Sequence, residues 1–168
     1  MHYAFYLDVS RCVGCQACAV ACMDQNDLEV EHGQDAWRQV FTVESGSFPD
    51  VKVDYISLAC MHCEDAPCLM ACPTGAIYRE GETGAVLVNS ALCIGCHSCS
   101  LACPFGIPRF GRDGKMQKCR LCIERVAAGL EPACVRTCPT RALKFGPANE
   151  LAGQVESRAA ARLIRALG

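Results

Sequence analysis

Several features that would identify a membrane protein or a nucleotide-binding enzyme are missing from this sequence. No apolar run approaches the roughly 20 residues that a membrane-spanning helix needs, and no signal-peptide pattern precedes the first cysteine. Neither a P-loop nor a dinucleotide-binding glycine motif is present. Aromatic residues make up 7% of the chain and the net charge is −2, without a basic–aromatic platform for nucleic acid. We therefore expect no direct membrane span and no nucleic acid partner.

Cysteine is the residue that the sequence has in excess. Its 16 cysteines among 168 residues are a density that indicates either a disulfide scaffold or a metal protein. They form four groups of four with none left over, whereas disulfide frameworks scatter their cysteines. The third group, Cys93-Ile94-Gly95-Cys96-His97-Ser98-Cys99-Ser100-Leu101-Ala102-Cys103-Pro104, has the spacing by which bacterial ferredoxins hold iron–sulfur clusters. In that motif three close thiolates bind one cluster and the fourth serves a neighbouring cluster.

The other three groups are variants of the same motif. Residues 12–22 repeat the spacing without the final proline, residues 60–73 widen one gap, and residues 119–139 place eleven residues between the second and third cysteines. The order of the groups indicates a complete two-cluster ferredoxin inserted into a second, split ferredoxin. We expect the clusters to act as the core and the iron-free chain to be poorly folded. Cluster assembly needs a reducing compartment, so a cytoplasmic location is expected, with export alongside a signal-bearing partner left open.

The predicted fold class is α+β, with two dicluster-ferredoxin-like units, one inserted in the other, and small sheets and short helices around four clusters. The four-cluster domain is predicted over 1–146, with the inserted ferredoxin at 55–108, the split ferredoxin at 1–30 plus 109–146, and a strand-rich connection at 31–54. Strands are expected at 3–8, 37–43, 51–56, 76–79, 85–89 and 142–145, with turns at 44–50 and at Asp113-Gly114. The last of these strands could pair with the first. A short helix is expected at 123–128, and 147–168 is predicted to be a C-terminal docking helix.

Charge is unevenly distributed along the chain. Residues 1–65 hold eleven acids against three bases, whereas residues 105–145 hold nine bases against three acids. Four oxidised clusters bound through the thiolates would take the net charge to roughly −10, so the basic stretch either offsets cluster charge or forms a docking patch. Lys118, Arg120 and His97 adjoin cysteines, where they either raise a local reduction potential or are simply solvated. The histidines (His2, His32, His62 and His97) are expected to be solvated or structural, and Trp37 to be a packing residue.

Several motifs together resemble a known family. They include Trp37-Arg38, His62-Cys63-Glu64-Asp65-Ala66-Pro67-Cys68, Cys72-Pro73-Thr74-Gly75-Ala76-Ile77-Tyr78 and Gly114-Lys115-Met116-Gln117-Lys118-Cys119. Over roughly residues 3–146 the chain resembles the four-cluster iron–sulfur subunits of molybdopterin oxidoreductases of the dimethyl sulfoxide reductase type, with polysulfide reductase and formate dehydrogenase beta subunits as relatives. The resemblance implies an electron-transfer subunit that is no enzyme by itself. Such a subunit passes single electrons between a molybdo- or tungstopterin catalytic subunit and another redox partner, such as a flavin or quinone subunit.

The resemblance also implies the ligands of four [4Fe–4S] clusters, with no catalytic residue in this chain. Cluster 1 would use Cys12, Cys15, Cys18 and Cys138, and cluster 2 would use Cys119, Cys122, Cys134 and Cys22. Cluster 3 would use Cys60, Cys63, Cys68 and Cys103, and cluster 4 would use Cys93, Cys96, Cys99 and Cys72. Each set takes three cysteines from one group and the fourth from another, in agreement with the general ferredoxin rule.

Only about twenty residues follow the region of resemblance that ends near residue 146, fewer than in many relatives. In this respect the chain is similar to the iron–sulfur subunit of tungsten-dependent aldehyde oxidoreductases, which works with a tungstopterin subunit and a flavin subunit. Two alternatives stay open, a free polyferredoxin shuttle and a structural zinc protein. The close spacing of the cysteines argues against two independent tetrahedral zinc sites. Self-stacking of the chain into longer wires is also left open.

Overall fold

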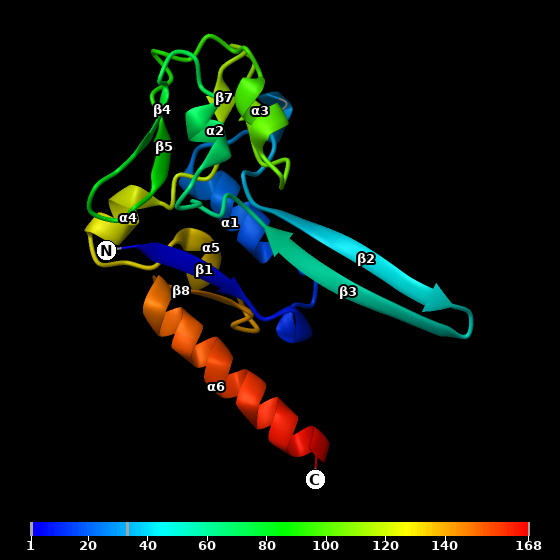
Figure 1. Cartoon of the computed structure of the whole chain (residues 1–168). Helices are drawn as coiled ribbons and strands as arrows, with labels where there is room; N and C mark the ends of the chain where they lie inside the picture. The colour runs from blue at the N-terminus through cyan, green and yellow to red at the C-terminus, as the bar shows by residue number, and fades with distance from the viewer. Residues whose placement is uncertain (1, 33, 168) are drawn as a thin grey trace.

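The computed structural model describes residues 2–32 and 34–167, in which short elements surround the cysteine groups (Figure 1). The strands are β1 (Tyr3–Leu7), β2 (Gln39–Ser47), β3 (Asp50–Leu58), β4 (Ile77–Arg79), β5 (Val86–Val88), β6 (Arg109–Phe110), β7 (Met116–Gln117) and β8 (Leu143–Pro147). The helices are α1 (Ala17–Gln25), α2 (Pro67–Met70), α3 (Ser98–Ala102), α4 (Ile123–Ala127), α5 (Ala133–Arg136) and α6 (Ala148–Leu167), with 3-10 turns η1 (Val9–Arg11) and η2 (Val30–His32). The strands pair two by two into small antiparallel sheets, as expected of an α+β, ferredoxin-like chain.

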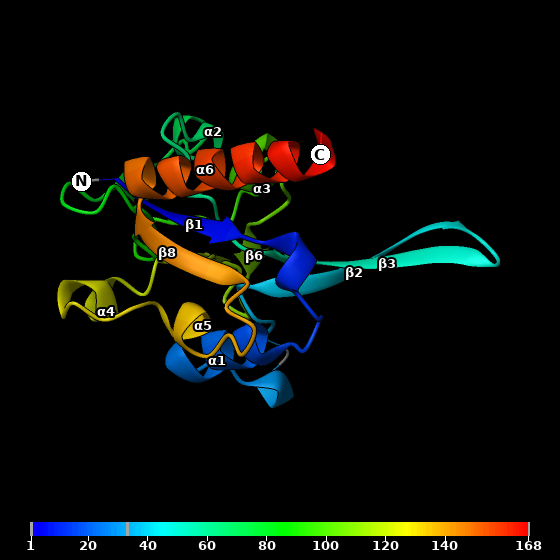
Figure 2. The same ribbon diagram turned by 90° about the horizontal axis from the view of Figure 1, so that it is seen from below.

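The first strand, β1, pairs with β8, the last strand before helix α6. The register runs from Tyr3 opposite Pro147 to Leu7 opposite Leu143, which confirms the predicted pairing of these segments. Phe145 stacks on Tyr3 with ring centroids 5.1 Å apart. Because α1 and α5 pack against each other beside this sheet (Figure 2), the first and fourth cysteine groups lie together although more than 90 residues separate them.

The β2–β3 hairpin projects from the rest of the molecule as a long two-stranded ribbon (Figures 1 and 2). The predicted turn over residues 44–50 is wrong in extent, because the strands continue to the Ser47–Asp50 pair and the turn is only Phe48-Pro49. A two-residue connection suffices to reverse a ribbon, so the flanking serines and Gly46 are taken into the strands. Most side chains of the hairpin are exposed.

The elements between the second and fourth cysteine groups gather at the other end of the molecule (Figure 1). The β4–β5 hairpin and the β6–β7 hairpin confirm the predicted strands and the turn at Asp113-Gly114. A buried cluster here contains Ala66, Ile77, Val86, Cys99 and Met116. Cysteines therefore make up part of both cores, since Cys18, Cys134 and Cys138 belong to the buried cluster beside β8.

Helix α6 packs only its beginning onto the body of the molecule. Leu151 is buried, whereas Val155 is 39% exposed and Leu163 is 61% exposed. Contacts of this helix are with β1 and β8. The predicted C-terminal helix is thus confirmed, and its apolar residues Val155 and Leu163 are left exposed. Within the residues that the structure describes, no helix is long and apolar enough to cross a membrane.

Candidate iron–sulfur sites

Two of the cysteine loops share an unusual backbone that leads into a helix. Gln16 (φ 62°) precedes α1 and His97 (φ 63°) precedes α3, both in the left-handed region. A glycine with positive φ stands two residues earlier in each loop, Gly14 at 68° and Gly95 at 69°. Glycine adopts this region at little cost, so the loop can curl tightly between its cysteines before the helix begins. The sequence C-x-G-C therefore specifies a loop that curves around a central space.

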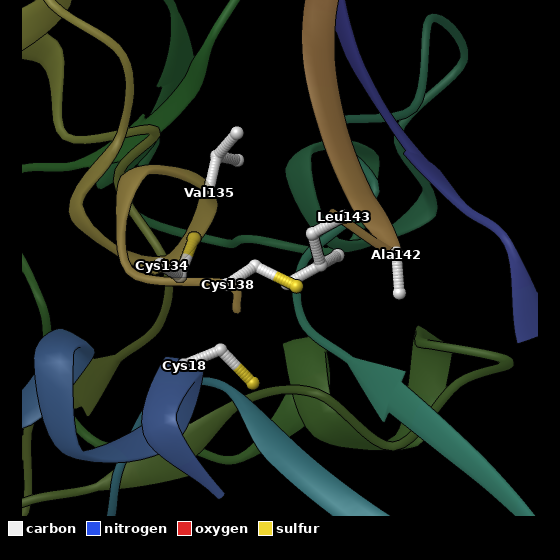
Figure 3. Close-up of a cluster of buried hydrophobic side chains, with 6 residues drawn as sticks. All are labelled: Cys18, Cys134, Val135, Cys138, Ala142 and Leu143. Atoms are coloured by element: carbon white, nitrogen blue, oxygen red, sulfur yellow. The ribbon is translucent and has the colours of Figure 1, made fainter. Parts of the chain in front are cut away.

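The cysteines predicted for cluster 1 line one cavity between α1 and the end of α5. The space between the atoms there is about 320 Å³, and it is walled by Cys12, Cys15, Cys18 and Cys138, with Leu7, Val40 and Ser57. Figure 3 shows the sulfurs of Cys18 and Cys138 on facing sides of one gap. Thiols from the first and the fourth groups thus share a single cavity.

The cysteines predicted for cluster 2 line a second cavity nearby. Its walls hold Cys22, Cys119, Cys122 and Cys134, together with Phe5, Trp37 and Arg38, around about 300 Å³. In Figure 3 the sulfur of Cys134 points away from those of Cys18 and Cys138. Cys134 on α5 and Cys138, two residues after the end of this helix, therefore line different cavities.

The cysteines predicted for cluster 4 line a third cavity of about 320 Å³. This cavity is walled by Cys72, Cys93, Cys96 and Cys99, with Ile77, His97, Phe110 and Met116. Again one thiol comes from a different group than the other three. The three cavities thus share the same composition, three cysteines of one group and one of another.

For cluster 3, electrostatics places three of the four predicted cysteines near one another. Burial is the main reason that the pKa of Cys68 is raised, and Cys60 and Cys103 raise it further, while Lys118 lowers it. The backbone N–H of His62 donates to the sulfur of Cys60 at 3.4 Å. In the part of the chain that the structure describes, no three His, Cys, Asp or Glu side chains are arranged to hold a single metal ion.

The same hydrogen bond between a threonine hydroxyl and a cysteine sulfur occurs at both ends of the molecule. The Oγ1 of Thr74 lies 3.7 Å from the sulfur of Cys72, and the Oγ1 of Thr140 lies 3.8 Å from the sulfur of Cys138. Burial opposes ionisation of both thiols, but these hydroxyls and nearby backbone N–H groups lower the pKa of Cys72 and of Cys138. The shared sequence Cys-Pro-Thr thus prepares both thiols to act as thiolates, the form that binds metal.

In the deeper cysteines burial outweighs the hydrogen bonds, and the net pKa shift is upward. Burial raises the pKa of Cys22 to about 12, with Cys119 and Cys134 raising it further. The pKa of Cys119 is raised to about 11 by burial, and Cys134 and Cys60 add to that shift. These thiols are protonated at neutral pH in the iron-free fold, so metal binding must displace their protons.

Two buried cations lie among the cysteines. Lys118 is 5% exposed, and its Nζ donates to the carbonyl oxygens of Val86 and Cys119. The alternative of a solvated Lys118 is therefore wrong. Arg120 is exposed and forms an ion pair with Glu124 on the first turn of α4, which agrees with the alternative that Arg120 is solvated. The ring of His97 stacks on Phe110 at 3.7 Å.

The second buried cation, Arg38, is a feature whose role sequence reasoning missed. It is 2% exposed, and its only sequence signal is the dipeptide Trp37-Arg38 within the resemblance. Burial alone would lower the pKa of Arg38, but the facing thiols of Cys134, Cys119 and Cys18 raise it. The buried positive charge of Arg38 is thus stabilised by negative charge on cysteines of both cavities, those predicted for cluster 1 and for cluster 2.

His62 confirms the structural interpretation of the histidines. It is 1% exposed, and its Nδ1 accepts a hydrogen bond from the backbone N–H of Val86 at 3.0 Å. Burial, with Lys118 and other positive neighbours, holds the pKa of His62 well below its ordinary value, so the ring is neutral. The side chain of His32 lies outside the described residues. Trp37 is half-buried, and its Nε1 donates to Gln117 at 3.4 Å, consistent with a packing role.

Comparison with known proteins gives a consistent result. Residues 51–148 match the model of the 4Fe-4S dicluster domain. The chain is 42% identical over 158 residues to the B subunit of the anaerobic dimethyl sulfoxide reductase of Escherichia coli (strain K12), an alignment that covers 89% of this chain and 75% of that protein. It is 44% identical over 150 residues to the thiosulfate reductase electron transfer subunit of Salmonella typhi, covering 88% of this chain and 77% of the relative.

The similarity extends to the formate dehydrogenase, nitrate-inducible, iron-sulfur subunit of Escherichia coli (strain K12), at 41% identity over 168 residues. That alignment covers 92% of this chain and 57% of the relative. Together with the four cysteine groups, these matches exclude the structural zinc alternative, because such subunits carry [4Fe–4S] clusters. The chain belongs to the family of dimethyl sulfoxide reductase-type iron–sulfur subunits, which transfer electrons through several [4Fe–4S] clusters within oxidoreductase complexes and are not enzymes on their own.

Proposed function

We propose that the chain holds four [4Fe–4S] clusters with crossed ligation and conducts single electrons between two redox partners. The observation that carries the proposal is the set of three similar cavities, each with three cysteines from one group and one from another. Sixteen cysteines provide for four clusters with four thiolates each. A bound cluster would take up and release one electron at a time, and the residues of this chain set its environment.

The proposed ligand sets are those that the resemblance implies. Cluster 1 is held by Cys12, Cys15, Cys18 and Cys138, and cluster 2 by Cys119, Cys122, Cys134 and Cys22. Cluster 3 is held by Cys60, Cys63, Cys68 and Cys103, and cluster 4 by Cys93, Cys96, Cys99 and Cys72. Clusters 1 and 2 form the split unit (1–30 plus 109–146), and clusters 3 and 4 form the inserted unit (55–108).

Electrostatic neighbours support a linear order of the four sites. The pKa of Cys134, raised mainly by burial, is also raised by Cys18 of the cluster 1 set. Cys60 of the cluster 3 set acts in the same way on Cys119 of the cluster 2 set. Burial and then Cys68 raise the pKa of Cys99, which links the sets of clusters 3 and 4. Each set therefore adjoins the next in the order 1, 2, 3, 4.

The proposed partners follow from the relatives. They are subunits named for dimethyl sulfoxide reductase, thiosulfate reductase and formate dehydrogenase, so a large pterin-containing catalytic subunit is proposed at one end of the series. It contains molybdenum or, as in aldehyde oxidoreductases, tungsten. A flavin or quinone subunit is proposed at the other end, with assembly in the cytoplasm. Exposed apolar residues on the β2–β3 hairpin and on α6, including Phe48 at 91% and Leu163 at 61% exposed, are suited to such docking.

Paired cysteine variants test the ligation. Crossed ligation predicts that Cys138→Ser and Cys15→Ser remove the same electron paramagnetic resonance signal, while Cys134→Ser and Cys22→Ser remove a different one. About 16 iron atoms per wild-type chain are expected. If Cys138→Ser instead removes the signal that Cys122→Ser removes, each group serves its own cluster and the proposed sets are wrong.

Anoxic purification from the native host tests the partners. Co-purification with a large subunit that contains molybdenum or tungsten is expected, and elemental analysis separates the two metals. A flavin in the complex would identify the second partner. A lone chain with iron and neither metal would contradict the subunit proposal and leave a free polyferredoxin.

A further inference from the structure

Arg38 lies at the boundary between the cavities proposed for clusters 1 and 2. Its side chain is part of the wall of the cavity that contains Cys22 and Cys134. Its Nη1 donates a hydrogen bond to the Oγ of Ser57 at 3.2 Å, and Ser57 is part of the wall of the cluster 1 cavity. One guanidinium therefore reaches both cavities, directly on one side and through a hydroxyl on the other.

The hydrogen bond through Ser57 continues to a proposed ligand. The Oγ of Ser57 lies 3.4 Å from the sulfur of Cys18. Because Arg38 has no acceptor atoms, the hydroxyl must accept from the guanidinium and is free to direct its own hydrogen at that sulfur. The positive charge of Arg38 is in this way connected to the cluster 1 ligand by two successive hydrogen bonds.

The charge of Arg38 has no carboxylate partner. It is 2% exposed, and among the described residues no Asp or Glu forms an ion pair with it. Its guanidinium lies 4.6 Å from the ring centroid of Phe5, and its Nε has no hydrogen-bond partner. An arginine this deeply buried is costly unless negative charge compensates it. The negative groups available to it are the thiolates of the two cysteine sets and the clusters that they would bind.

We propose that Arg38 is the shared counter-charge of clusters 1 and 2 and raises the reduction potentials of both. This inference rests on the proposed function, since it needs clusters in the two cavities. Reduction adds a negative charge to a cluster, and a buried cation beside it stabilises the reduced form more than the oxidised form. Arg38 thereby favours electrons on the split unit, whose two cavities it and its hydrogen-bonded partner Ser57 line.

Redox titration of the reconstituted chain, monitored by electron paramagnetic resonance, tests the proposal. Signals are assigned with the Cys138→Ser and Cys22→Ser variants. Arg38→Met removes the charge and keeps an apolar stem, so both clusters 1 and 2 should become harder to reduce. The equilibrium constant for reducing each of these two clusters should fall at least tenfold, which corresponds to 59 mV for a one-electron couple. Arg38→Lys retains the charge but loses the planar guanidinium that stacks on Phe5, so each equilibrium constant should change less than in Arg38→Met.

A matched control removes the same charge from an exposed site. Arg136 is an exposed residue on α5, two positions after Cys134, and water screens its charge. Arg136→Met should therefore change the two equilibrium constants less than threefold. Equal shifts for Arg136→Met and Arg38→Met would overturn the proposal, and so would a shift confined to one cluster in Arg38→Met.

A second variant keeps the proposal testable if Arg38→Met does not assemble. Ser57→Ala removes the hydroxyl and leaves the charge of Arg38 in place, so the potential of cluster 1 should fall more than that of cluster 2. Unchanged potentials in Ser57→Ala, together with a change of tenfold or more in Arg38→Lys, would refute the role of Arg38. Absence of cluster signals in the wild-type chain would instead refute the proposed function, so the two failures are distinguishable.

Discussion

Gly95→Ala is the substitution for which the structure allows the most detailed prediction. Gly95 has φ +69°, and a Cβ there would stand 2.5 Å from the carbonyl oxygen of Gly114. A left-handed alanine costs about 1–2 kcal/mol, and the backbone shift needed to relieve such a contact costs about 1–3 kcal/mol more. The total is about 2–5 kcal/mol. The displaced segment includes Met116, whose N–H donates to the sulfur of Cys93 at 3.4 Å.

Gly75→Ala supplies the control for this prediction. Gly75 has φ +64° with nothing within 4 Å of the added Cβ, so only the cost of about 1–2 kcal/mol applies. Gly95 directly precedes Cys96 and Gly75 follows Cys72 by three residues. Both cysteines are proposed for cluster 4, so the comparison isolates the contact with Gly114. The assay follows the absorbance of the iron–sulfur clusters at about 400 nm and measures how fast it is lost in guanidinium under anoxic conditions. Gly95→Ala should lose it several-fold faster than Gly75→Ala, and equal rates would refute the reasoning.

Three further predictions concern hydrogen bonding and packing. Thr74→Val removes the hydroxyl 3.7 Å from the sulfur of Cys72, and the reduction potential of that cluster should fall because one donor to its ligand is lost; redox titration measures the change. His62→Leu leaves the buried N–H of Val86 without the acceptor 3.0 Å away, which should destabilise the chain by about 1–3 kcal/mol, seen as faster cluster loss. Leu151→Ala removes the buried contact of α6, a truncation worth about 2–5 kcal/mol, so hydrogen exchange along α6 should speed up while the cluster spectra stay unchanged.

Each of these three has its own comparison. Thr74→Ser keeps the hydroxyl and should preserve the potential; a fall equal to that of Thr74→Val would show that packing, and not the hydrogen bond, is responsible. His62→Asn retains an acceptor in the side chain and should be milder than His62→Leu. Leu163 is 61% exposed, so Leu163→Ala should leave exchange at the beginning of α6 unaltered; equal effects of the two leucine variants would contradict the packing described for Leu151.

Local patterns in the sequence predicted many of the elements correctly. Residues 3–8 and 142–145 were predicted to be strands that could pair, and they do. The short helix predicted at 123–128 is α4 (Ile123–Ala127). The β2–β3 ribbon was predicted too short, because Gly46 and the serines beside it signal a turn locally. They are drawn into strands by pairing that runs to Ser47 opposite Asp50.

The sequence by itself determined the chemistry of this protein, because thiolate count and spacing decide which metal groups can be bound and how many. The cysteine motif also predicted that each cluster is bound by three cysteines of one group and one cysteine of another. Only the tertiary structure decided which charges are buried among these cysteines. Arg38 and Lys118 look like ordinary surface residues in the sequence, yet they are 2% and 5% exposed. These residues are buried because segments far apart in the chain come together around them. Burial also weakens the screening by water, so one charge can act on two sites.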